Sequence, residues 1–493
     1  MIGRTGYLFI LTSVLFAACS TTKNIPKNDA LYTGANVVLH ASDITIRQKK
    51  VFREDLQNMT RPKPNSKFLG IPFKLMIWNM FSAKKENSFF GKLRSRWGQP
   101  PVLLSQVDLK ANTDILQNYL QNKGFFNAVV VGDTIVRRRR ANARYNAEAG
   151  SQYKINSVQF PTDSSELSQK IIEASSKTLL LKGKPYDLDV IKGERDRIDA
   201  YLKEIGYYYF NPDLLIIQVD STIGNHLVDM RVQVKPATPA IAREPFKIND
   251  VYIYSDYSLN TAQVDTVKSH AKFFEGYYVI DEKNKYKPKL FRRIMLFDPG
   301  DWYSRSDHNK SLSRLINLNV FKFVKNRFER ADVDSPKLNV YYYLTPFPSK
   351  SIRAEVGANN KSNNMNGSTV SFGFHHRNAF HAGEQLDFRI YAGTEASFGG
   401  TYQGFTTYRA GGELKIGVPR FLVPFYNLNT RSGYVPRSNL SLSYELLNRF
   451  KLYTMTSFRS DLGYSWKESL TKSHEFNPIS INYVLPANIT SLY

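Results

Sequence analysis

Cysteine is nearly absent from this chain, which has one thiol in 493 residues. A single cysteine excludes an internal disulfide framework and any metal site built from several thiolates. The sequence also lacks the G-x-S-x-G, H-E-x-x-H and G-x-x-x-x-G-K-[ST] motifs of common catalytic and phosphate-binding sites. In the one histidine cluster, His375, His376 and His381, the adjacent pair cannot chelate, because neighbouring strand residues point to opposite faces. We therefore expect no enzymatic activity, no cofactor and no metal.

Acidic residues are fewer than basic ones: the chain has 43 Asp and Glu and 67 Lys and Arg, so its formal net charge is +24. Clustered basic residues can neutralise nucleic-acid phosphates, but here they are dispersed except for Arg137, Arg138, Arg139 and Arg140. Anionic head groups of outer-membrane lipids explain the same excess. We expect lipids and no nucleic acid as partners. The simplest account of the arginine run is a solvated strand end, and contact with head groups or an acidic partner is the alternative.

Long apolar runs are also missing. The N-terminal stretch YLFILTSVLF at residues 7–16 is too short to cross a bilayer, which needs about 20 apolar residues. With Arg4 before it and Ala17-Ala18 after it, it makes residues 1–18 a signal peptide. The setting of Cys19 resembles a bacterial lipobox, which implies that Cys19 becomes the acylated first residue; a plain signal with an incidental cysteine is the alternative. Residues 19–30 form a polar tether. The tether lacks an acidic run of the kind that resembles a surface-export signal, so we expect the lipid anchor to lie in the periplasmic leaflet of the membrane.

A unit of strands and helices recurs between residues 31 and 348. Two alternating strands match closely, YKINSV at 153–158 and FKINDV at 246–251. Amphipathic helices that end in a turn recur at 115–126, 197–208 and 312–321. The turn positions are Gly124, Gly206 and Asn319, residue types suited to the left-handed backbone of a helix C-cap. Aromatic residues after each turn are expected to begin the next strand. The predicted order is strand, helix, helix, strand, strand, in three copies.

These repeats resemble the polypeptide-transport-associated (POTRA) domains of the BamA/TamA superfamily of outer-membrane assembly proteins. The resemblance implies POTRA domains at residues 31–150, 151–240 and 241–348, the first with an insertion at about 61–105. The segments CSTTKNIP at 19–26 and LYTGA at 31–35 look like the TamA-like lipoproteins (TamL) of Bacteroidetes. In that family an acylated N-terminus replaces the plain signal of the proteobacterial proteins.

The insertion is rich in apolar side chains, among them Phe68, Leu69, Phe73, Ile77 and Trp78. Two interpretations are equally open. The segment could lie in the membrane interface beside the anchor or bind a partner. It could instead be an excursion between two helices that packs on its own domain, because periodicity does not separate a buried helix from an interfacial one.

Strands after residue 348 are long and alternate with period two, as in TVSFGFH at 369–375, QLDFRI at 385–390 and NLSLSYEL at 439–446. A soluble sandwich also alternates, but strand length, aromatic strand ends and Asn/Gly-rich links favour strands with an apolar face toward lipid. We predict the N-terminal part of an antiparallel transmembrane β-barrel over residues 349–493. About seven strands can be counted, fewer than in the related barrels. Because an open sheet in lipid leaves unpaired edges, we expect a fragment or an incomplete reading of a longer gene, with a minimal eight-stranded barrel as the alternative.

The resemblance implies an outer-membrane protein assembly or translocation factor. Its POTRA domains would receive unfolded outer-membrane protein clients, or a TamB-like partner anchored in the inner membrane, by strand addition. The seam in the barrel's first strand would include Ile352, Arg353, Ala354, Glu355 and Val356, with Ile352, Ala354 and Val356 toward lipid. Two alternatives remain open: a transporter for one dedicated passenger protein, and a surface-attached lipoprotein enzyme or adhesin.

Overall fold

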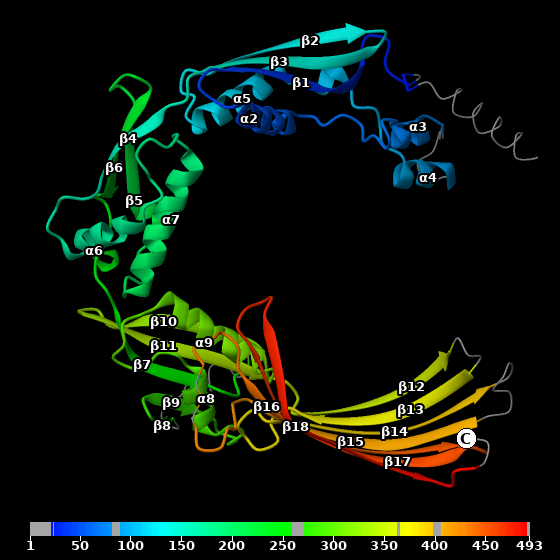
Figure 1. Ribbon diagram of the computed structural model, residues 1–493. Coiled ribbons are helices and arrows are strands. Elements are labelled where there is room, and N and C mark those ends of the chain that lie inside the picture. The colour runs from blue at the N-terminus through cyan, green and yellow to red at the C-terminus, as the bar shows by residue number, and fades with distance from the viewer. Residues whose placement is uncertain are drawn as a thin grey trace, which may run out of the picture. The chain divides into compact units, whose positions relative to one another are not determined.

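The computed structural model describes residues 21–22, 24–80, 89–258, 271–361, 365–397, 406–426, 428 and 430–490. It divides into two compact units. The first contains the described residues up to Ile198 together with Asn211–Ala237, and the second contains Asp199–Phe210 and the described residues from Thr238 onward. The expected signal peptide and Cys19 lie outside the described residues. Figure 1 labels the helices and strands of both units.

The first module is a three-stranded sheet with helices on one face. Strand β3 is central, parallel to β1 and antiparallel to β2. Every second residue of β3 is buried, because alternate side chains of a strand share a face; this face packs in a core with Leu56, Leu116 and Leu120 of the helices. The elements are β1 (Leu31–Ala41), α2 (Ile46–Met59), α5 (Leu109–Asn122), β2 (Val129–Arg137) and β3 (Arg140–Gly150).

The described residues of the insertion in this module include three short helices. They are α3 (Phe73–Met80), α4 (Phe89–Trp97) and a 3-10 helix (Leu104–Gln106). Two asparagine side chains close its base. Asn112 accepts from the Arg61 amide at 2.7 Å and donates to the Arg61 carbonyl, and Asn65 accepts from the Val102 amide at 3.0 Å. Both side chains are buried, so their hydrogen bonds fix where the insertion leaves and rejoins the module.

The second repeat has the same strand order, with β6 parallel to β4 and antiparallel to β5. Apolar residues of β6, Val228, Met230 and Val232, are fully buried on one face. The elements are β4 (Lys154–Gln159), α6 (Glu166–Ala174), a 3-10 helix (Ser175–Lys177), α7 (Leu188–Glu204), a 3-10 helix (Pro212–Leu214), β5 (Leu215–Asp220) and β6 (Leu227–Val234).

The third module differs from the predicted order because two further strands lie between its first strand and its helices. Its sheet has the order β10-β11-β7-β9-β8. Glu275 and Gly276 both have positive φ in the turn between β8 and β9, the geometry of a tight two-residue hairpin turn. The elements are a 3-10 helix (Ala240–Ala242), β7 (Lys247–Tyr254), β8 (Lys272–Phe274), β9 (Tyr277–Ile280), α8 (Pro288–Ile294), α9 (Arg305–Asn317), β10 (Phe321–Asp332) and β11 (Ser335–Pro346).

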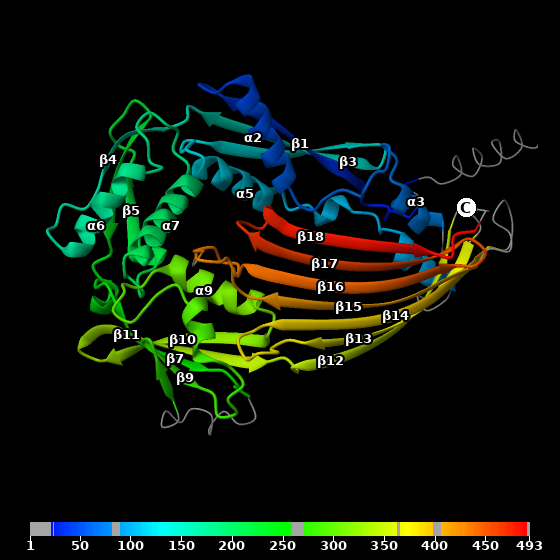
Figure 2. The ribbon, with the colours of Figure 1, turned by 60° about the horizontal axis from the view of Figure 1, so that its bottom comes forward.

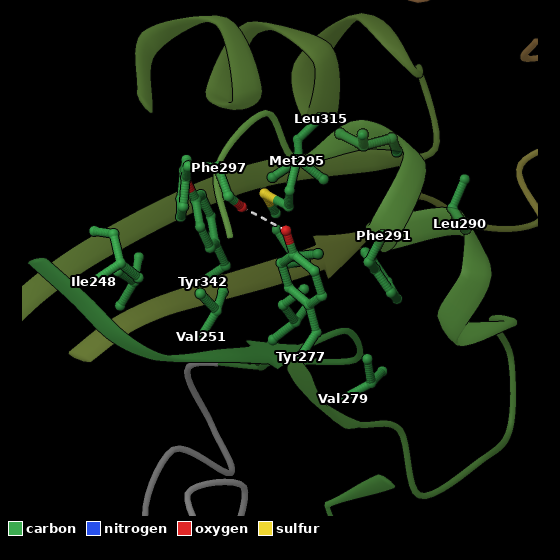
Figure 3. Close-up of a cluster of buried hydrophobic side chains, with 14 of the residues drawn as sticks. Ile248, Val251, Tyr277, Val279, Leu290, Phe291, Met295, Phe297, Leu315 and Tyr342 are labelled. Carbon is green, nitrogen blue, oxygen red and sulfur yellow. Dashed lines mark hydrogen bonds between the residues drawn. The ribbon is translucent and has the colours of Figure 1, made fainter. Parts of the chain in front are cut away.

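The core of the third module lies between this sheet and helices α8 and α9. Figure 3 shows Phe291 and Leu315 from the two helices facing Tyr277 and Tyr342 from the strands. The Tyr277 hydroxyl donates to the Phe297 carbonyl at 2.5 Å, so this aromatic ring is buried with its polar group satisfied. Burial raises the pKa of the Tyr277 hydroxyl, with a further contribution from the charge of Asp298.

The three helix turns place their marker residues in the left-handed region: φ is +89° at Gly124, +108° at Gly206 and +64° at Asn319. After α5, the Phe125 amide bonds the Leu120 carbonyl at 3.0 Å and the Gly124 amide bonds the Gln121 carbonyl at 3.0 Å, which is the Schellman pattern. Phe125 is therefore a buried cap residue, and β2 begins only at Val129. The same holds for Tyr207 before β5. Aromatic residues thus close the helix in these two repeats. Of the three strands that come after these turns, only β10 begins at an aromatic residue, Phe321.

The last part of the second unit is one antiparallel sheet of seven strands in chain order (Figure 2). Its outer strands, β12 and β18, are not paired with each other, so the described sheet is not closed. Links at the end near the third module span 377–384, 419–436 and 468–472. The strands are β12 (Lys350–Asn360), β13 (Met365–His376), β14 (Gln385–Ser397), β15 (Thr406–Val418), β16 (Arg437–Arg449), β17 (Tyr453–Lys467) and β18 (Ser473–Ala487).

Replacing Gly124 should cost more stability than replacing Gly150, although both have positive φ. A Cβ at Gly124 would lie 2.8 Å from the Tyr186 carbonyl oxygen, whereas a Cβ at Gly150 would meet nothing within 4 Å. We expect G150A to lose about 1 kcal/mol from left-handed strain alone and G124A to lose clearly more. Denaturant unfolding of the two variants checks this, and equal losses would contradict a steric role for Gly124.

Candidate functional site

The seven-stranded sheet has one face that is apolar from strand to strand. Residues paired across neighbouring strands share a face, and the pairing joins apolar residues repeatedly. One row runs across five strands through Ile352, Phe374, Phe388, Leu414 and Leu442. A second row runs across all seven through Ala354, Phe372, Ile390, Gly412, Tyr444, Phe458 and Tyr483. These rows form a continuous apolar surface.

This apolar face is solvent-accessible in the described structure. Phe372, Phe388, Ile390, Tyr444 and Phe458 each count among the exposed large apolar residues. Soluble monomers rarely expose a contiguous apolar patch of more than a few hundred Å², and a soluble sandwich would cover such a face with a second sheet. The strands have 11 to 15 residues, enough for the roughly 9–11 residues that a transmembrane strand needs.

The opposite face carries polar and charged side chains that pair with one another. Lys415 lies 2.6 Å from Glu413, and Arg389 lies 3.9 Å from Glu355 of β12. The Tyr391 hydroxyl donates to Glu445 at 2.6 Å. Gly411 makes room for this contact, since a Cβ there would lie 2.6 Å from the Tyr391 ring. The face therefore has the hydrophilic character of a barrel interior.

The predicted seam lies on β12, the outer strand that follows the third module. All eleven residues of β12 are exposed. Ile352 and Val356 are 67% and 81% exposed and lie on the apolar face, while Arg353 and Glu355 lie on the polar face and form an ion pair at 3.4 Å. Ala354 lies between Ile352 and Val356 on the apolar face. An exposed strand edge is a template for pairing with another chain.

The first two helix turns bond the start of the next module, which the sequence did not reveal. The Gly124 carbonyl accepts from the Tyr153 amide at 2.9 Å, and the Gly206 carbonyl accepts from the Phe246 amide at 2.8 Å. Lys123 adds ion pairs of 2.9 Å to Asp187 and to Asp189. Burial alone lowers the pKa of Lys123, but these two carboxylates outweigh it and raise the pKa. The two aspartates at the start of α7 therefore bind the end of α5.

The end of α9 is bonded to the seven-stranded sheet. The Leu318 carbonyl accepts from Arg437 of β16 at 3.2 Å and from Gln385 of β14 at 3.4 Å. Arg314 is buried and donates to the Ser432 carbonyl at 2.7 Å and to the Thr430 carbonyl. These guanidinium groups lie at a helix C-terminus, where positive charge is favoured. The link at 419–436 is thus held against the third module.

The arginine run is not simply a solvated strand end. Arg138 and Arg139 form the tight turn between β2 and β3, with φ of +47° and +62°. Arg139 donates to the carbonyl of Pro26 at 2.9 Å, and Arg140 donates to the Thr21 hydroxyl at 3.0 Å. Two of the four arginines therefore bind the tether. A run of identical residues carries no periodic signal that could have shown this.

The insertion residues are divided between a packed and an open side. Leu75 and Met76 are buried, whereas Phe68, Leu69 and Phe73 are exposed. Ile77 and Trp78 are half-buried. The insertion thus packs on its own module with one side of α3 and leaves apolar residues open on the other.

No three His, Cys, Asp or Glu side chains within the described ranges are placed to hold a metal ion. His375 pairs with Asp387 at 2.6 Å. None of the helices in the described part of the chain combines the length and the apolar character needed to cross a bilayer.

Comparison with known proteins finds matches among solved structures at low sequence identity. No protein family and no curated protein matches the sequence. Among solved structures, BamA POTRA3-5 of Haemophilus influenzae is 14% identical over 65% of this chain and 99% of that chain, with a TM-score of 0.33. BamA of Haemophilus ducreyi lacking POTRA domains 1-3 is 11% identical over 66% of this chain and 64% of that chain, with a TM-score of 0.36. CdiB of Acinetobacter baumannii is 11% identical over 69% of this chain and 62% of that chain, with a TM-score of 0.30. With TM-scores below 0.5, none of these likenesses decides what this chain does.

Loss of the Arg314 guanidinium should release the 419–436 link. R314M leaves two backbone carbonyls of the link without this donor and should speed protease cleavage within the link. Lys310 lies one turn earlier on α9 and bonds only weakly to Asp307, at 4.0 Å, so K310M is a matched control. Time courses of limited proteolysis on the full chain measure the effect. Identical cleavage rates for both variants would show that Arg314 does not hold the link.

Proposed function

We propose that this chain is an outer-membrane protein assembly or translocation factor. The observation that carries the proposal is the continuous apolar face of the seven-stranded sheet, backed by a face of paired charges. In water such a face would be strongly unfavourable, while in a bilayer it is the side expected to contact lipid. The sheet then lies in the outer membrane, and the modules before it lie in the periplasm.

The modules suit the reception of extended client chains. Strand β2 is an outer strand of the first sheet, and its Val129, Val131 and Ile135 are exposed. An outer strand with exposed apolar side chains can pair with an extended peptide, whose main chain supplies affinity and whose side chains supply specificity. Unfolded outer-membrane proteins provide such segments.

Within this class we favour a TamA-like lipoprotein with an acylated Cys19 and a TamB-like partner. Support comes from the segments at 19–26 and 31–35 and from the bonds that hold the tether to the first module. An enzymatic role is not part of the proposal. A transporter for one dedicated passenger is the second candidate, because a charged inner face would also suit a secretion channel.

Depletion of the protein in its native cell tests the function. Loss of many outer-membrane proteins together supports assembly, and loss of one secreted protein supports the passenger transporter. Complementation adds the structural test. L442K places a charge on the apolar face, at a cost of about 2–4 kcal/mol near the bilayer midplane, and should fail to restore the proteome. S443K places the same charge on the next residue of β16, on the polar face, and should restore it. Restoration by both variants would refute a lipid-facing sheet.

Client contact at the seam can be measured by photo-crosslinking. A photoreactive residue at Val356 on the outer strand β12 should capture unfolded clients during assembly. The same residue at Phe388, on the same face of the inner strand β14, should capture none because both edges of β14 are already paired. Equal capture at both positions would point to non-specific adhesion to the apolar face.

A further inference from the structure

The insertion of the first module presents apolar side chains that its own core does not use. Phe68, Leu69, Phe89 and Trp97 are 74%, 88%, 75% and 60% exposed, and Phe90 is also exposed. Helix α3 already buries its other side, because Leu75 packs with Ile25, Leu31 and Leu103. The exposed residues therefore have no remaining place in the core of the module.

The same segment is strongly basic. Residues 61–100 contain nine Lys or Arg and a single acidic residue, Glu86. Lys67, Lys74 and Lys92 form no ion pair within the described residues. Arg94 lies 3.9 Å above the Trp78 ring, a cation–π contact that joins α4 to α3. Exposed aromatic residues in a segment that is rich in Lys and Arg match the composition of an interfacial membrane segment.

The tether is bonded to this same helix. Asn79 of α3 accepts from the Asn24 side chain at 3.2 Å and donates to the Thr21 carbonyl at 3.3 Å. Thr21 is two residues after Cys19, and two peptide units span at most about 7 Å. A lipid attached at Cys19 would therefore enter the bilayer close to α3.

We propose that helices α3 and α4 of the insertion dock on the anionic surface of the lipid bilayer. Basic residues near such a surface are attracted to its head groups, and exposed aromatic residues can enter the interface. A protein partner explains the surface less well, because a partner gives no reason for the bonds between α3 and the tether. The proposal goes beyond the assembly function and draws on it only for the acylated anchor.

Tryptophan fluorescence tests the docking in the full chain, because the four tryptophans are Trp78, Trp97, Trp302 and Trp466. Three single-tryptophan chains retain Trp97, Trp302 or Trp466, and each carries W78F so that Arg94 keeps an aromatic ring to stack on. They are reconstituted in phosphatidylethanolamine–phosphatidylglycerol vesicles with brominated acyl chains. Trp466 in β17 reports insertion of the sheet, and Trp302 in the third module is the control outside the insertion. We expect Trp97 to shift to the blue and to lose emission beyond the Trp302 control.

One further chain and one further vesicle composition serve as controls. F68S/L69S in the Trp97 chain removes two largely exposed side chains without touching the core and should reduce the quenching. Vesicles without phosphatidylglycerol should reduce it as well. Quenched Trp466 with unquenched Trp97 would overturn the docking and leave the membrane sheet standing. Failure of Trp466 as well would count against the proposed function itself.

Discussion

The alternation of side chains along paired strands is the constraint on which the seven-stranded sheet of this protein depends. Neighbouring strands from β12 to β17 pair without a register shift. A slip of one residue would turn Phe388 to the polar side and Arg389 to the apolar side. The charge pairs on the inner face, such as Lys415 with Glu413, oppose such a slip because a displaced charge would lie in the apolar layer. One register shift occurs, between Leu462 and Tyr464 in the pairing of β17 with β18.

A second recurring interaction links a helix end to the segment after it. The carbonyl groups at a helix C-terminus have no partner within the helix, and here they bond the next structural segment. Gly124 and Gly206 each accept an amide from the residue just before the first strand of the next module, and Leu318 accepts from Arg437 of the sheet. Small residues stand at the first two turns because a neighbouring backbone or ring occupies the space of a side chain. The repeat is thus a device for joining domains as well as a fold.

The first module also holds the tether in place through hydrogen bonds. Arg139 of its β2–β3 turn and Arg140 of β3 donate hydrogen bonds to the tether, and Asn79 of its insertion also bonds the tether. Three segments that are far apart in the sequence, the tether included, therefore meet at residues 21–26. The insertion that carries the exposed aromatic residues is thus bonded directly to the tether.

Much of the architecture was readable from the sequence, because it depends on local periodicity. Period-two patterns marked the long strands, and the residues Gly124, Gly206 and Asn319 marked helix turns that adopt positive φ. Chemistry that needs a motif at fixed spacing could also be searched for directly. These features depend on residues that are close in the chain, so the sequence by itself determined them.

Tertiary structure decided the rest. The sequence does not predict the β8–β9 hairpin, because its strands have only three and four residues, which are too few to show a period. The aromatic residues after the first two turns pack under their helix instead of beginning a strand, since the Schellman bonds return the chain to the core. The contacts of Arg314, Arg437 and Asn79 join residues that are more than fifty positions apart. No local pattern encodes such pairs, because only the packing of complete modules brings them within hydrogen-bonding distance.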